Sequence, residues 1–391
     1  MKDAPASPAS GALPTVLVLG MGDTGILTAG RLSRHCRVIA VTTKPLLVSG
    51  QELGLRLTGH AQWRRDYLTP LDRYRRLSRV EIIHGKAIRV DPVARTAALE
   101  LAGGEHCSLH WDYLVIASGV SNGFWRDDRL ETHQLIESRL NAQIEAVTAA
   151  SSVAVVGGGP SGVSAAYNLK RAYPNKEVTL FFSAHELLPG YPKNTQHYHQ
   201  KLLARQGVVL HGGHRAVVSS DAVTSRLQGG RLEFEAGQPS FQAELIIWAA
   251  GRLKPHTDFL PKDMLDAAGF VRTDAHLNVE GYARIFAIGD VAATDPLRCS
   301  ARNWAYKVLC RNLRARVLQR PMPARFNPPS HRWGSIVGPQ PTGLRLHGPT
   351  GKSRALPRWL VHWLLYPLVV RGFIYGGVRS SRKMSVTQDS K

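Results

Sequence analysis

Two glycine-rich segments carry the residue types and spacing that bind the pyrophosphate of a dinucleotide. The first is Gly20-Met-Gly22-Asp23-Thr24-Gly25, and the second is Gly157-Gly-Gly159-Pro160-Ser161-Gly162. In such a segment the first glycine permits a tight turn, the second lets a phosphate approach the backbone, and the third packs the helix against the strand. The free N–H groups at the start of the following helix then bind the phosphates.

The residues around each segment predict a strand before it and a helix after it. An apolar strand over 15–19 precedes the first segment, a helix follows to about Arg34, and a second strand covers 37–41. The second segment follows a strand over 152–156 and precedes a helix to about Arg171 and a strand over 177–182. This repeated order predicts an α/β protein with two Rossmann-like three-layer units, each for one dinucleotide.

The end of the second strand in each unit normally carries the group that binds the adenosine ribose. In the first unit this position holds Thr42, whose hydroxyl can bind ribose, and Lys44 follows within reach of a phosphate. In the second unit the strand ends at Phe182, without the acidic residue typical of NADH sites or an arginine for the 2′-phosphate of NADPH. Both NADH and NADPH therefore stay open.

Three further motifs agree with the two glycine-rich segments. They are Tyr113-Leu-Val-Ile-Ala-Ser118-Gly119, Glu244-Leu-Ile-Ile-Trp-Ala-Ala250-Gly251 and Ile285-Phe-Ala-Ile-Gly289-Asp290-Val291. Together the five motifs span about residues 14 to 320, and in this order the chain resembles the two-dinucleotide-binding-domain flavoproteins, the FAD/NAD(P)-dependent pyridine nucleotide oxidoreductases. The resemblance implies FAD in the first unit, NADH or NADPH in the second, and hydride transfer between them.

The resemblance also implies a domain plan and a set of cofactor-binding residues. A leader (1–13) precedes a discontinuous FAD-binding domain (14–120 and 252–325), into which an NAD(P)-binding domain (121–251) is inserted, and a C-terminal segment (326–391) follows. The expected FAD residues are Gly20, Gly22, Asp23, Thr24, Gly25, Thr42, Lys44, Ser118, Gly119, Gly289, Asp290 and Val291. The expected NAD(P) residues are Gly157, Gly159, Pro160, Ser161, Gly162, Phe182, Ala250 and Gly251.

Within this superfamily the layout is similar to type II NADH:quinone oxidoreductases and to the apoptosis-inducing-factor and ferroptosis-suppressor branch. The four cysteines contain no CxxC pair, which argues against disulfide-reductase members and fits a reducing cytoplasm. Two departures concern the acceptor: Ser164 stands where type II enzymes have a glutamate, and 301–308 lacks both glutamines of their quinone motif. An NAD(P)H dehydrogenase with a quinone or other small acceptor is expected, and a redox-sensing flavoprotein with little turnover is the alternative.

No catalytic acid or base is assigned, because the cofactor carries the chemistry. Lys44 and Lys307 are the candidates for tuning the flavin ring, since a cation stabilises anionic reduced flavin; the alternative is that both are solvated surface lysines. Trp304 and Tyr306 are candidates for flanking an aromatic acceptor or for core packing. His197 with His199, and His211 with His214, lack matching partners for a metal, so no metal site is expected and surface positions are predicted.

The 391-residue chain has 50 Lys+Arg against 29 Asp+Glu, a net charge of +21 that favours anionic partners. No RNA-binding or helix-turn-helix pattern accompanies this charge, so nucleic-acid binding is not predicted. Between Ala355 and Arg379, an apolar run with Trp359, Trp363 and Tyr366 is bounded by Arg358 and Arg371, which is typical of a helix lying on a membrane surface. The alternatives are packing on the body or in a homodimer interface. A cytoplasmic protein is expected, with peripheral contact to the cytoplasmic face of the membrane and no spanning helix.

Overall fold

The first sheet of the computed structural model is built around the strand that precedes the first glycine-rich segment. The structure describes residues 12–50, 52–218, 227–250, 253–298 and 304–379. The sheet has the order β16-β8-β1-β2-β5-β6-β7. Its strands are β1 (Thr15–Leu19), β2 (Arg37–Thr42), β5 (Val80–Asp91), β6 (Thr96–Leu101), β7 (His106–His110), β8 (Tyr113–Ile116) and β16 (Ile285–Ala287). The strands from β16 to β5 pair in parallel, and β5, β6 and β7 pair antiparallel.

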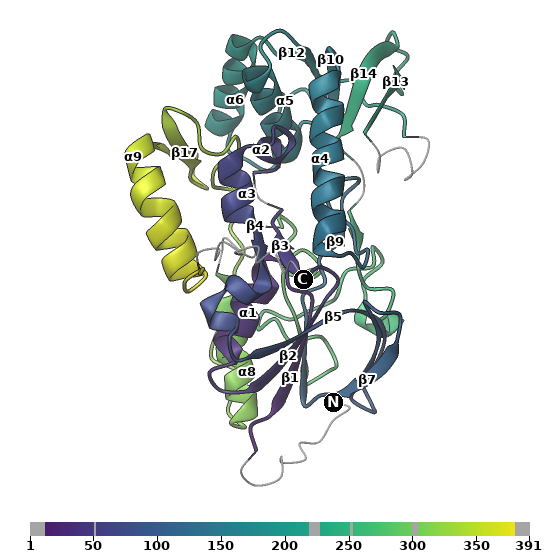
Figure 1. Cartoon of the computed structure of the whole chain (residues 1–391), viewed down its shortest axis with the longest axis vertical. Helices are drawn as coiled ribbons and strands as arrows, with labels where there is room; N and C mark the ends of the chain where they lie inside the picture. The colour runs from purple at the N-terminus through teal and green to yellow at the C-terminus, as the bar shows by residue number, and fades with distance from the viewer. Residues whose placement is uncertain (1–11, 51, 219–226, 251–252, 299–303, 380–391) are drawn as a thin grey trace, which may run out of the picture.

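The second sheet repeats the parallel arrangement around the second glycine-rich segment. Its order is β12-β11-β10-β14-β13, with only the edge strand β13 antiparallel. Its strands are β10 (Ser152–Val156), β11 (Glu177–Phe181), β12 (Val209–His211), β13 (Gln228–Leu232) and β14 (Phe241–Trp248). In Figure 1 this sheet lies above the first one, and the long helix α4 (His133–Ala149) runs beside it.

The central strands form because both of their faces are covered. In the first sheet, helices cover one face, and the strands β5–β7 with the segment 259–292 cover the other. Val16, Leu17, Val18 and Leu19 of β1 are all at most 2% exposed, and β10 has the same buried pattern. Parallel strands buried on both faces read as continuous apolar runs, which explains why the sequence predicts these two strands correctly. The predicted α/β class with two Rossmann-like units is confirmed.

Two of the main helices, α1 and α5, begin at the glycine-rich segments, and the other two pack against the same two units. They are α1 (Asp23–Leu32), α5 (Pro160–Ala172), α6 (Lys193–Gln206) and α8 (Ala305–Val317). The shorter elements are α2 (Leu53–Leu57), α3 (Ala61–Tyr67), and the short strands β3 (Leu46–Val48), β4 (Leu68–Pro70), β9 (Val120–Ser121) and β15 (Lys254–Pro255). The helix predicted over 301–318 corresponds to α8, and residues 301–303 lie outside the described residues.

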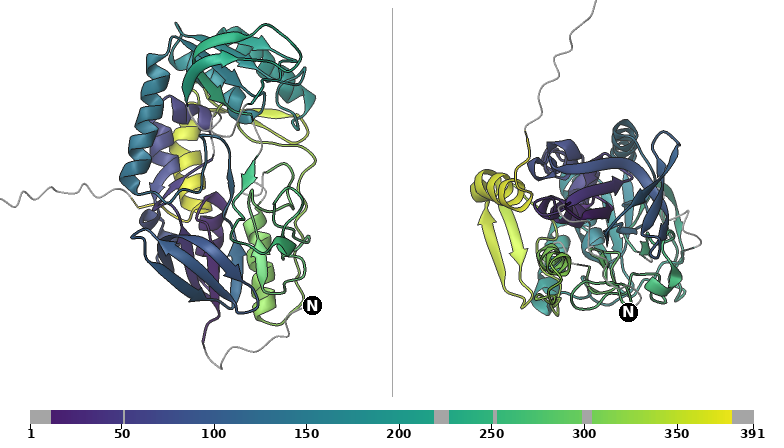
Figure 2. Two further views of the ribbon diagram at one scale, coloured as in Figure 1. Left: turned by 90° about the vertical axis from the view of Figure 1, so that its right-hand side faces the viewer. Right: turned by 90° about the horizontal axis from the view of Figure 1, so that it is seen from below.

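The C-terminal part of the described chain is a hairpin followed by a helix. The hairpin joins β17 (Gly343–His347) to β18 (Ser353–Pro357), and α9 (Arg358–Leu360) continues directly into a π-helix, Val361–Ile374. We call residues 358–374 the C-terminal helix. Figure 1 and the right-hand view of Figure 2 show this yellow hairpin and helix against one side of the body. No helix in the described part of the chain is long and apolar enough to cross a membrane.

Candidate dinucleotide site

The first glycine-rich segment forms a close turn between β1 and α1. Gly20 has φ +104°, a left-handed value that favours glycine, and a Cβ there would overlap the carbonyl oxygen of Ala117. A Cβ on Gly25 would overlap the carbonyl oxygen of Gly20, so this glycine lets the helix pack against the strand end. A Cβ on Gly22 would meet nothing within 4 Å. Backbone at Gly22 is therefore open to a ligand at the start of α1.

The second segment has the same construction between β10 and α5. Gly157 has φ +127°, and a Cβ there would lie 2.6 Å from the backbone of Ala249. A Cβ on Gly162 would overlap the carbonyl oxygen of Gly157, whereas a Cβ on Gly159 would again meet nothing within 4 Å. No side chain caps the start of either helix, so the free N–H groups in the first turns remain available to an anion; in α5 they begin at Ser161, because Pro160 has none.

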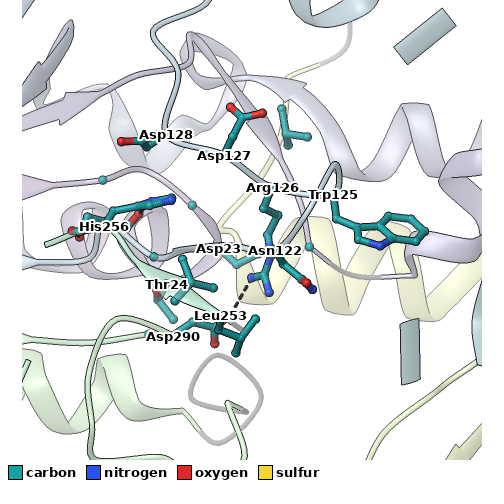
Figure 3. Close-up of a pocket in the computed structure, with 18 of the residues that line it drawn as sticks. Asp23, Thr24, Asn122, Trp125, Arg126, Asp127, Asp128, Leu253, His256 and Asp290 are labelled. Atoms are coloured by element: carbon teal, nitrogen blue, oxygen red, sulfur yellow. Dashed lines mark hydrogen bonds and ion pairs between the residues drawn. The ribbon is translucent and has the colours of Figure 1, made fainter. Parts of the chain in front are cut away.

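One cavity of about 700 Å³ connects the two segments. Its walls come from the loop after β1, the end of β2, the loop after β8, the start of α5 and the loop after β16. Figure 3 shows part of this cavity, with Asp23 and Thr24 at the start of α1 and Asp290 on the loop after β16. Ligands bound at the starts of α1 and α5 would therefore share one cavity.

Most residues expected to bind a cofactor line this cavity. Those expected on the FAD side that line it are Gly20, Gly22, Asp23, Thr24, Thr42, Lys44, Ser118, Gly119, Gly289 and Asp290. On the NAD(P) side, Gly159, Pro160 and Ser161 line it, together with Ala249 and Ser164. Gly25, Gly157 and Gly162 instead pack strand against helix behind the cavity wall.

Three further predicted cofactor residues do not line the cavity, and one lies outside the described residues. The side chain of Val291 is fully buried in the core beneath the first sheet, and Phe182 is 4% exposed in the core of the second unit. Ala250 packs against the cluster around Trp248. None of these three lines the cavity, so only their backbone could contribute to it. Gly251 lies outside the described residues.

Lys44 lies at the cavity wall but is neither a solvated lysine nor a free cation. Its Nζ donates to Asp127 Oδ1 at 3.0 Å and Glu131 Oε2 at 2.9 Å, and its side chain is 15% exposed. Arg139 pairs with the same two carboxylates. Burial raises the pKa of Asp127, but the hydrogen bond from Arg129 and the charges of Lys44 and Arg139 outweigh it and hold that pKa well below its ordinary value. The surface interpretation of Lys44 was therefore wrong.

The second candidate lysine, Lys307, is not among the residues that line the cavity. Its Nζ lies 3.9 Å from the ring centroid of Trp304, a cation–π contact on α8. Tyr306 is 4% exposed and belongs to the core between α8 and the first sheet. Of the two alternatives for Tyr306, core packing is the one that the structure supports.

Arg126 is a cavity residue that the sequence analysis missed. Its Nη1 donates to Asp290 Oδ2 at 2.6 Å, as the dashed line in Figure 3 marks. Arg298 donates to the carbonyl oxygens of Asp290 and Ala292 from the other side. Two arginines thus hold the loop after β16 in place. Neither belongs to a spaced motif, so no pattern in the sequence identifies them.

His256 is a second cavity residue without a sequence signal. Its ring contacts Ser118 O at 2.8 Å through Nδ1 and Ser121 Oγ at 2.7 Å through Nε2, while Ser118 Oγ donates to His256 O at 2.7 Å. Burial lowers the pKa of His256. The histidine therefore joins the loop after β8 to the return of the chain at β15.

Two tyrosines connect the C-terminal segment to the cavity. Tyr375 Oη donates to Asp23 Oδ1 at 2.7 Å, and Tyr366 Oη donates to Glu52 Oε1 at 2.8 Å. Asp23 and Glu52 both line the cavity. Both tyrosines are buried, and Tyr366 also accepts a hydrogen bond from Tyr67 at 3.1 Å. The inner face of the C-terminal helix, together with Tyr375 directly after it, is therefore part of the wall that supports the site.

The paired histidines do not all lie at the surface. His199 is 1% exposed and contacts the Thr195 carbonyl oxygen at 2.9 Å, which corrects its predicted surface position, whereas His197 is exposed. His211 and His214 are half-buried and pack against the ring of Phe181. Among the described residues, no three His, Cys, Asp or Glu side chains form a group that could hold a metal ion.

Comparison with known proteins identifies the family. Residues 14–309 match the model of the pyridine nucleotide-disulphide oxidoreductases, which is more than half of the chain. The chain belongs to this family. Membership confirms the recognised superfamily and the prediction of an NAD(P)H-dependent oxidoreductase, and it agrees with FAD and a nicotinamide dinucleotide as the cofactors.

Curated relatives are similar over part of their length. The oxidoreductase ptaL of Pestalotiopsis fici is 29% identical over 55% of this chain and 57% of its own. Ferroptosis suppressor protein 1 of Homo sapiens is 27% identical over 57% of this chain and 61% of its own. The matched region therefore spans little more than half the length of these curated relatives.

Solved structures show the same fold at low identity. The water-forming NADH oxidase from Lactobacillus brevis, bound to NADH, superposes with a TM-score of 0.61 and 19% identity, covering 83% of this chain and 73% of its own. At this identity the likeness describes the fold alone.

Proposed function

We propose that this protein is an FAD-dependent NAD(P)H dehydrogenase that passes electrons to a quinone or a similar small acceptor. The observation that carries the proposal is the single cavity lined by both glycine-rich segments and by Gly289 and Asp290. FAD is assigned to the side of Gly20, Gly22 and Asp290, and NADH or NADPH to the side of Gly159 and Ser161. When bound, FAD would accept hydride from the nicotinamide and deliver two electrons to the acceptor, which takes up protons to give the reduced product.

The residues present fit these two groups. Open backbone at Gly22 and Gly159, each at an uncapped helix start, suits two pyrophosphates. The carboxylate of Asp290 suits the hydroxyls of a ribityl chain, and the Nε of Arg126 beside it is buried without a hydrogen-bond partner. The chain's own part is to bind and orient the cofactors and to exclude water from their contact.

The domain plan follows from the same assignment. We assign residues 14–120 and 252–325 to the FAD unit, since β16 pairs with β8 in the sheet that contains β1. Residues 121–251 are assigned to the NAD(P) unit around β10, and 326–391 to a C-terminal segment. The chain leaves the FAD unit at β9 and returns to it at β15, and these two strands pair antiparallel. This pairing supports boundaries near residues 120 and 252.

The C-terminal helix is proposed to attach the protein peripherally to a membrane. Its outward face carries Trp359, Trp363 and Phe373, which are 64%, 72% and 66% exposed, and Leu364, Leu368 and Val369 continue the same face. We call these six residues the apolar stripe. Apolar surface of this size on a helix, with aromatics and flanking arginines, suits the interface of a bilayer. Attachment there would bring the site close to a lipid-soluble quinone.

A redox-sensing flavoprotein is the second candidate, and Ser164 favours it. Ser164 lines the cavity, and its hydroxyl and carbonyl oxygens accept from Asn168 Nδ2 at 3.4 Å and 2.9 Å. A serine in this position brings no charge to the nicotinamide, unlike the glutamate of the type II enzymes that the sequence resembles. Reduced flavin that reoxidises slowly would favour this candidate.

Anaerobic stopped-flow spectroscopy tests the proposal and separates the two candidates. The purified protein is mixed with NADH or NADPH and then with a short-chain quinone. Rapid bleaching of the flavin band followed by rapid quinone-dependent recovery supports the dehydrogenase and identifies the donor. Bleaching without recovery supports the sensor, and a protein that purifies without flavin and does not take up FAD contradicts both.

A further inference from the structure

A second, smaller cavity lies where the C-terminal helix meets the body of the protein. Its volume is about 210 Å³, and among the described residues none lines both this cavity and the dinucleotide cavity. Four separate segments form it: the start of α3, the end of α5, the loop 339–341 and the C-terminal helix. Its charged and hydrogen-bonding side chains are His60, Gln62, Arg65, Arg171, Gln340, Arg358 and His362.

The cavity is strongly cationic. Arg65 is balanced by Asp66, to which it donates from Nε and Nη2 at 3.0 Å and 3.1 Å. Arg171 donates to the side-chain oxygen of Gln340, and neither Arg171 nor Arg358 forms an ion pair with a carboxylate in the part of the chain that the structure describes. Two guanidinium groups therefore face a cavity that contains no opposing charge.

Two residues that line the cavity each carry a buried polar atom without a hydrogen-bond partner. These atoms are Nδ1 of His60 and Nε2 of Gln62. An unpaired buried polar atom is costly, and such atoms indicate a ligand or water that completes them. Burial and the charges of Arg171 and Arg65 lower the pKa of His60, which reports the positive field that an anion would relieve.

The apolar stripe begins beside this cavity. The cavity is lined from this helix by Arg358, Val361 and His362. Their neighbours in the sequence, Trp359 and Trp363, belong to the stripe. Because the helix is a π-helix with wider turns, positions four or five residues apart share one face, which aligns the stripe from Trp359 to Phe373. An anion in the cavity and hydrocarbon against the stripe could thus belong to one molecule.

We propose that this cavity binds a phosphate group, and that the headgroup of an anionic phospholipid supplies it. Guanidinium groups donate parallel hydrogen bonds to phosphate oxygens, which suits Arg171 and Arg358. The adjacent stripe favours a lipid over a soluble phosphate ester as the source. The lipid source depends on the membrane attachment proposed above, but the phosphate site itself does not depend on the redox activity.

Vesicle binding by the full-length protein tests this site. Vesicles of phosphatidylcholine alone are compared with vesicles that also contain phosphatidylglycerol, using wild type, Arg171→Gln, Arg358→Gln and the control Arg354→Gln. Arg354 is an exposed arginine on β18 that does not line the cavity, so it matches the loss of charge. Arg354→Gln removes only a surface charge and should weaken vesicle binding about fivefold. Arg171→Gln and Arg358→Gln each remove a charged hydrogen bond in the cavity and should weaken binding at least about tenfold, and only on anionic vesicles.

Titration with inorganic phosphate and glycerol phosphate distinguishes the source. Vesicle binding that needs both cavity arginines and is not displaced by inorganic phosphate supports the lipid headgroup. Stoichiometric binding of either soluble ion, lost in Arg171→Gln, supports the phosphate site with a soluble source. Cavity variants that behave like Arg354→Gln in every titration overturn the site. Reduction of the flavin by NAD(P)H, followed in the same preparations, shows separately whether the proposed dehydrogenase holds and whether each variant is folded.

Discussion

Arg126 and Asp290 form an ion pair of 2.6 Å across the dinucleotide cavity. Asp290 lies on the loop after β16, whereas Arg126 comes from the segment after β9, 164 positions earlier in the chain. The side chain of Arg126 is 30% exposed and that of Asp290 is 21% exposed, so water reaches the pair and screens it. In the proposed holoenzyme the carboxylate of Asp290 accepts hydrogen bonds from the ribityl hydroxyls of FAD. The carboxylate must then either bind Arg126 and FAD together or release Arg126.

Substitution of Asp290 is expected to weaken FAD binding much more than substitution of Arg126. Asp290→Asn removes a charged acceptor worth about 1.5–3 kcal/mol, so the Kd for FAD should rise about tenfold or more. Arg126→Gln removes a partly exposed ion pair worth about 1 kcal/mol or less, so the Kd should change less than about fivefold. Fluorescence titration of the apoprotein with FAD measures both. Equal losses would show that Arg126 itself contacts FAD.

Gly22→Ala and Gly159→Ala should separate the two cofactors. Both glycines have negative φ, and a Cβ on either meets no protein atom within 4 Å, so the melting temperature should stay unchanged. The added methyl group would occupy space proposed for pyrophosphate. Gly22→Ala should therefore lower FAD content, whereas Gly159→Ala should retain FAD and raise the KM for NAD(P)H.

Gly25→Ala is the matched control for this pair. Its Cβ would overlap the carbonyl oxygen of Gly20, so α1 would have to move away from β1. Such overpacking costs about 1–3 kcal/mol or more. The control should lower the melting temperature along with FAD content, and an unchanged melting temperature would contradict the packing role assigned to this glycine.

The sequence predicts the elements whose apolar pattern and turn chemistry are local. β1 and β10 have their predicted bounds, because parallel strands buried on both faces need an unbroken apolar run beside a glycine turn. The hairpin of β17 and β18 was not predicted, since its strands are short and partly exposed and lack a strong alternation.

Contacts between distant segments were not predictable from one sequence. Asp23 and Tyr375 are 352 positions apart, and nothing local to either residue indicates their hydrogen bond. Lys44 was assigned to the flavin or the surface because its partners Asp127 and Glu131 are more than 80 positions away. Burial of a charged or polar side chain depends on such partners, so residue type alone misplaced Lys44 and His199.

Protonation of the buried His199 should lower the free energy of unfolding in mild acid. Burial lowers its pKa to about 4, against an ordinary 6.5, although the Thr195 carbonyl opposes this shift. Because the folded pKa lies below the unfolded one, the unfolded chain takes up the proton first. The stability contribution is complete above about pH 6.5 and is lost as the pH falls through 4.

Urea unfolding between pH 7 and 4 measures this loss. His199→Gln should flatten the dependence of the unfolding free energy on pH by about 2–3 kcal/mol over that range. His197→Gln on the same helix changes an exposed histidine and should leave the dependence as it is in wild type. His347 also has its pKa lowered to about 4, by burial, the neighbouring His199 and Arg345, so part of the dependence should remain in the first variant. A dependence equal to that of wild type would contradict the buried neutral His199.

Trp363→Ser and Phe373→Ser should release the protein from vesicles without destabilising it. Both side chains lie mostly in solvent, at 72% and 66% exposure, so their loss should leave the melting temperature unchanged. Burying one large apolar side chain contributes about 1.5–3 kcal/mol, so each substitution should weaken binding to neutral vesicles about tenfold or more. Val93→Ser is the control, because Val93 is 87% exposed in the turn between β5 and β6, away from the C-terminal helix.

The same variants test whether the attachment serves the reaction. Reduction of a long-chain quinone embedded in the vesicles should fall with vesicle binding, whereas reduction of a soluble short-chain quinone should stay at the wild-type rate. The buried tyrosines Tyr366 and Tyr375 stay in place in both variants, so the cavity wall that they support is preserved. Equal loss of both activities would mean that the stripe stabilises the site itself, and undiminished vesicle binding would mean that another surface contacts the lipid.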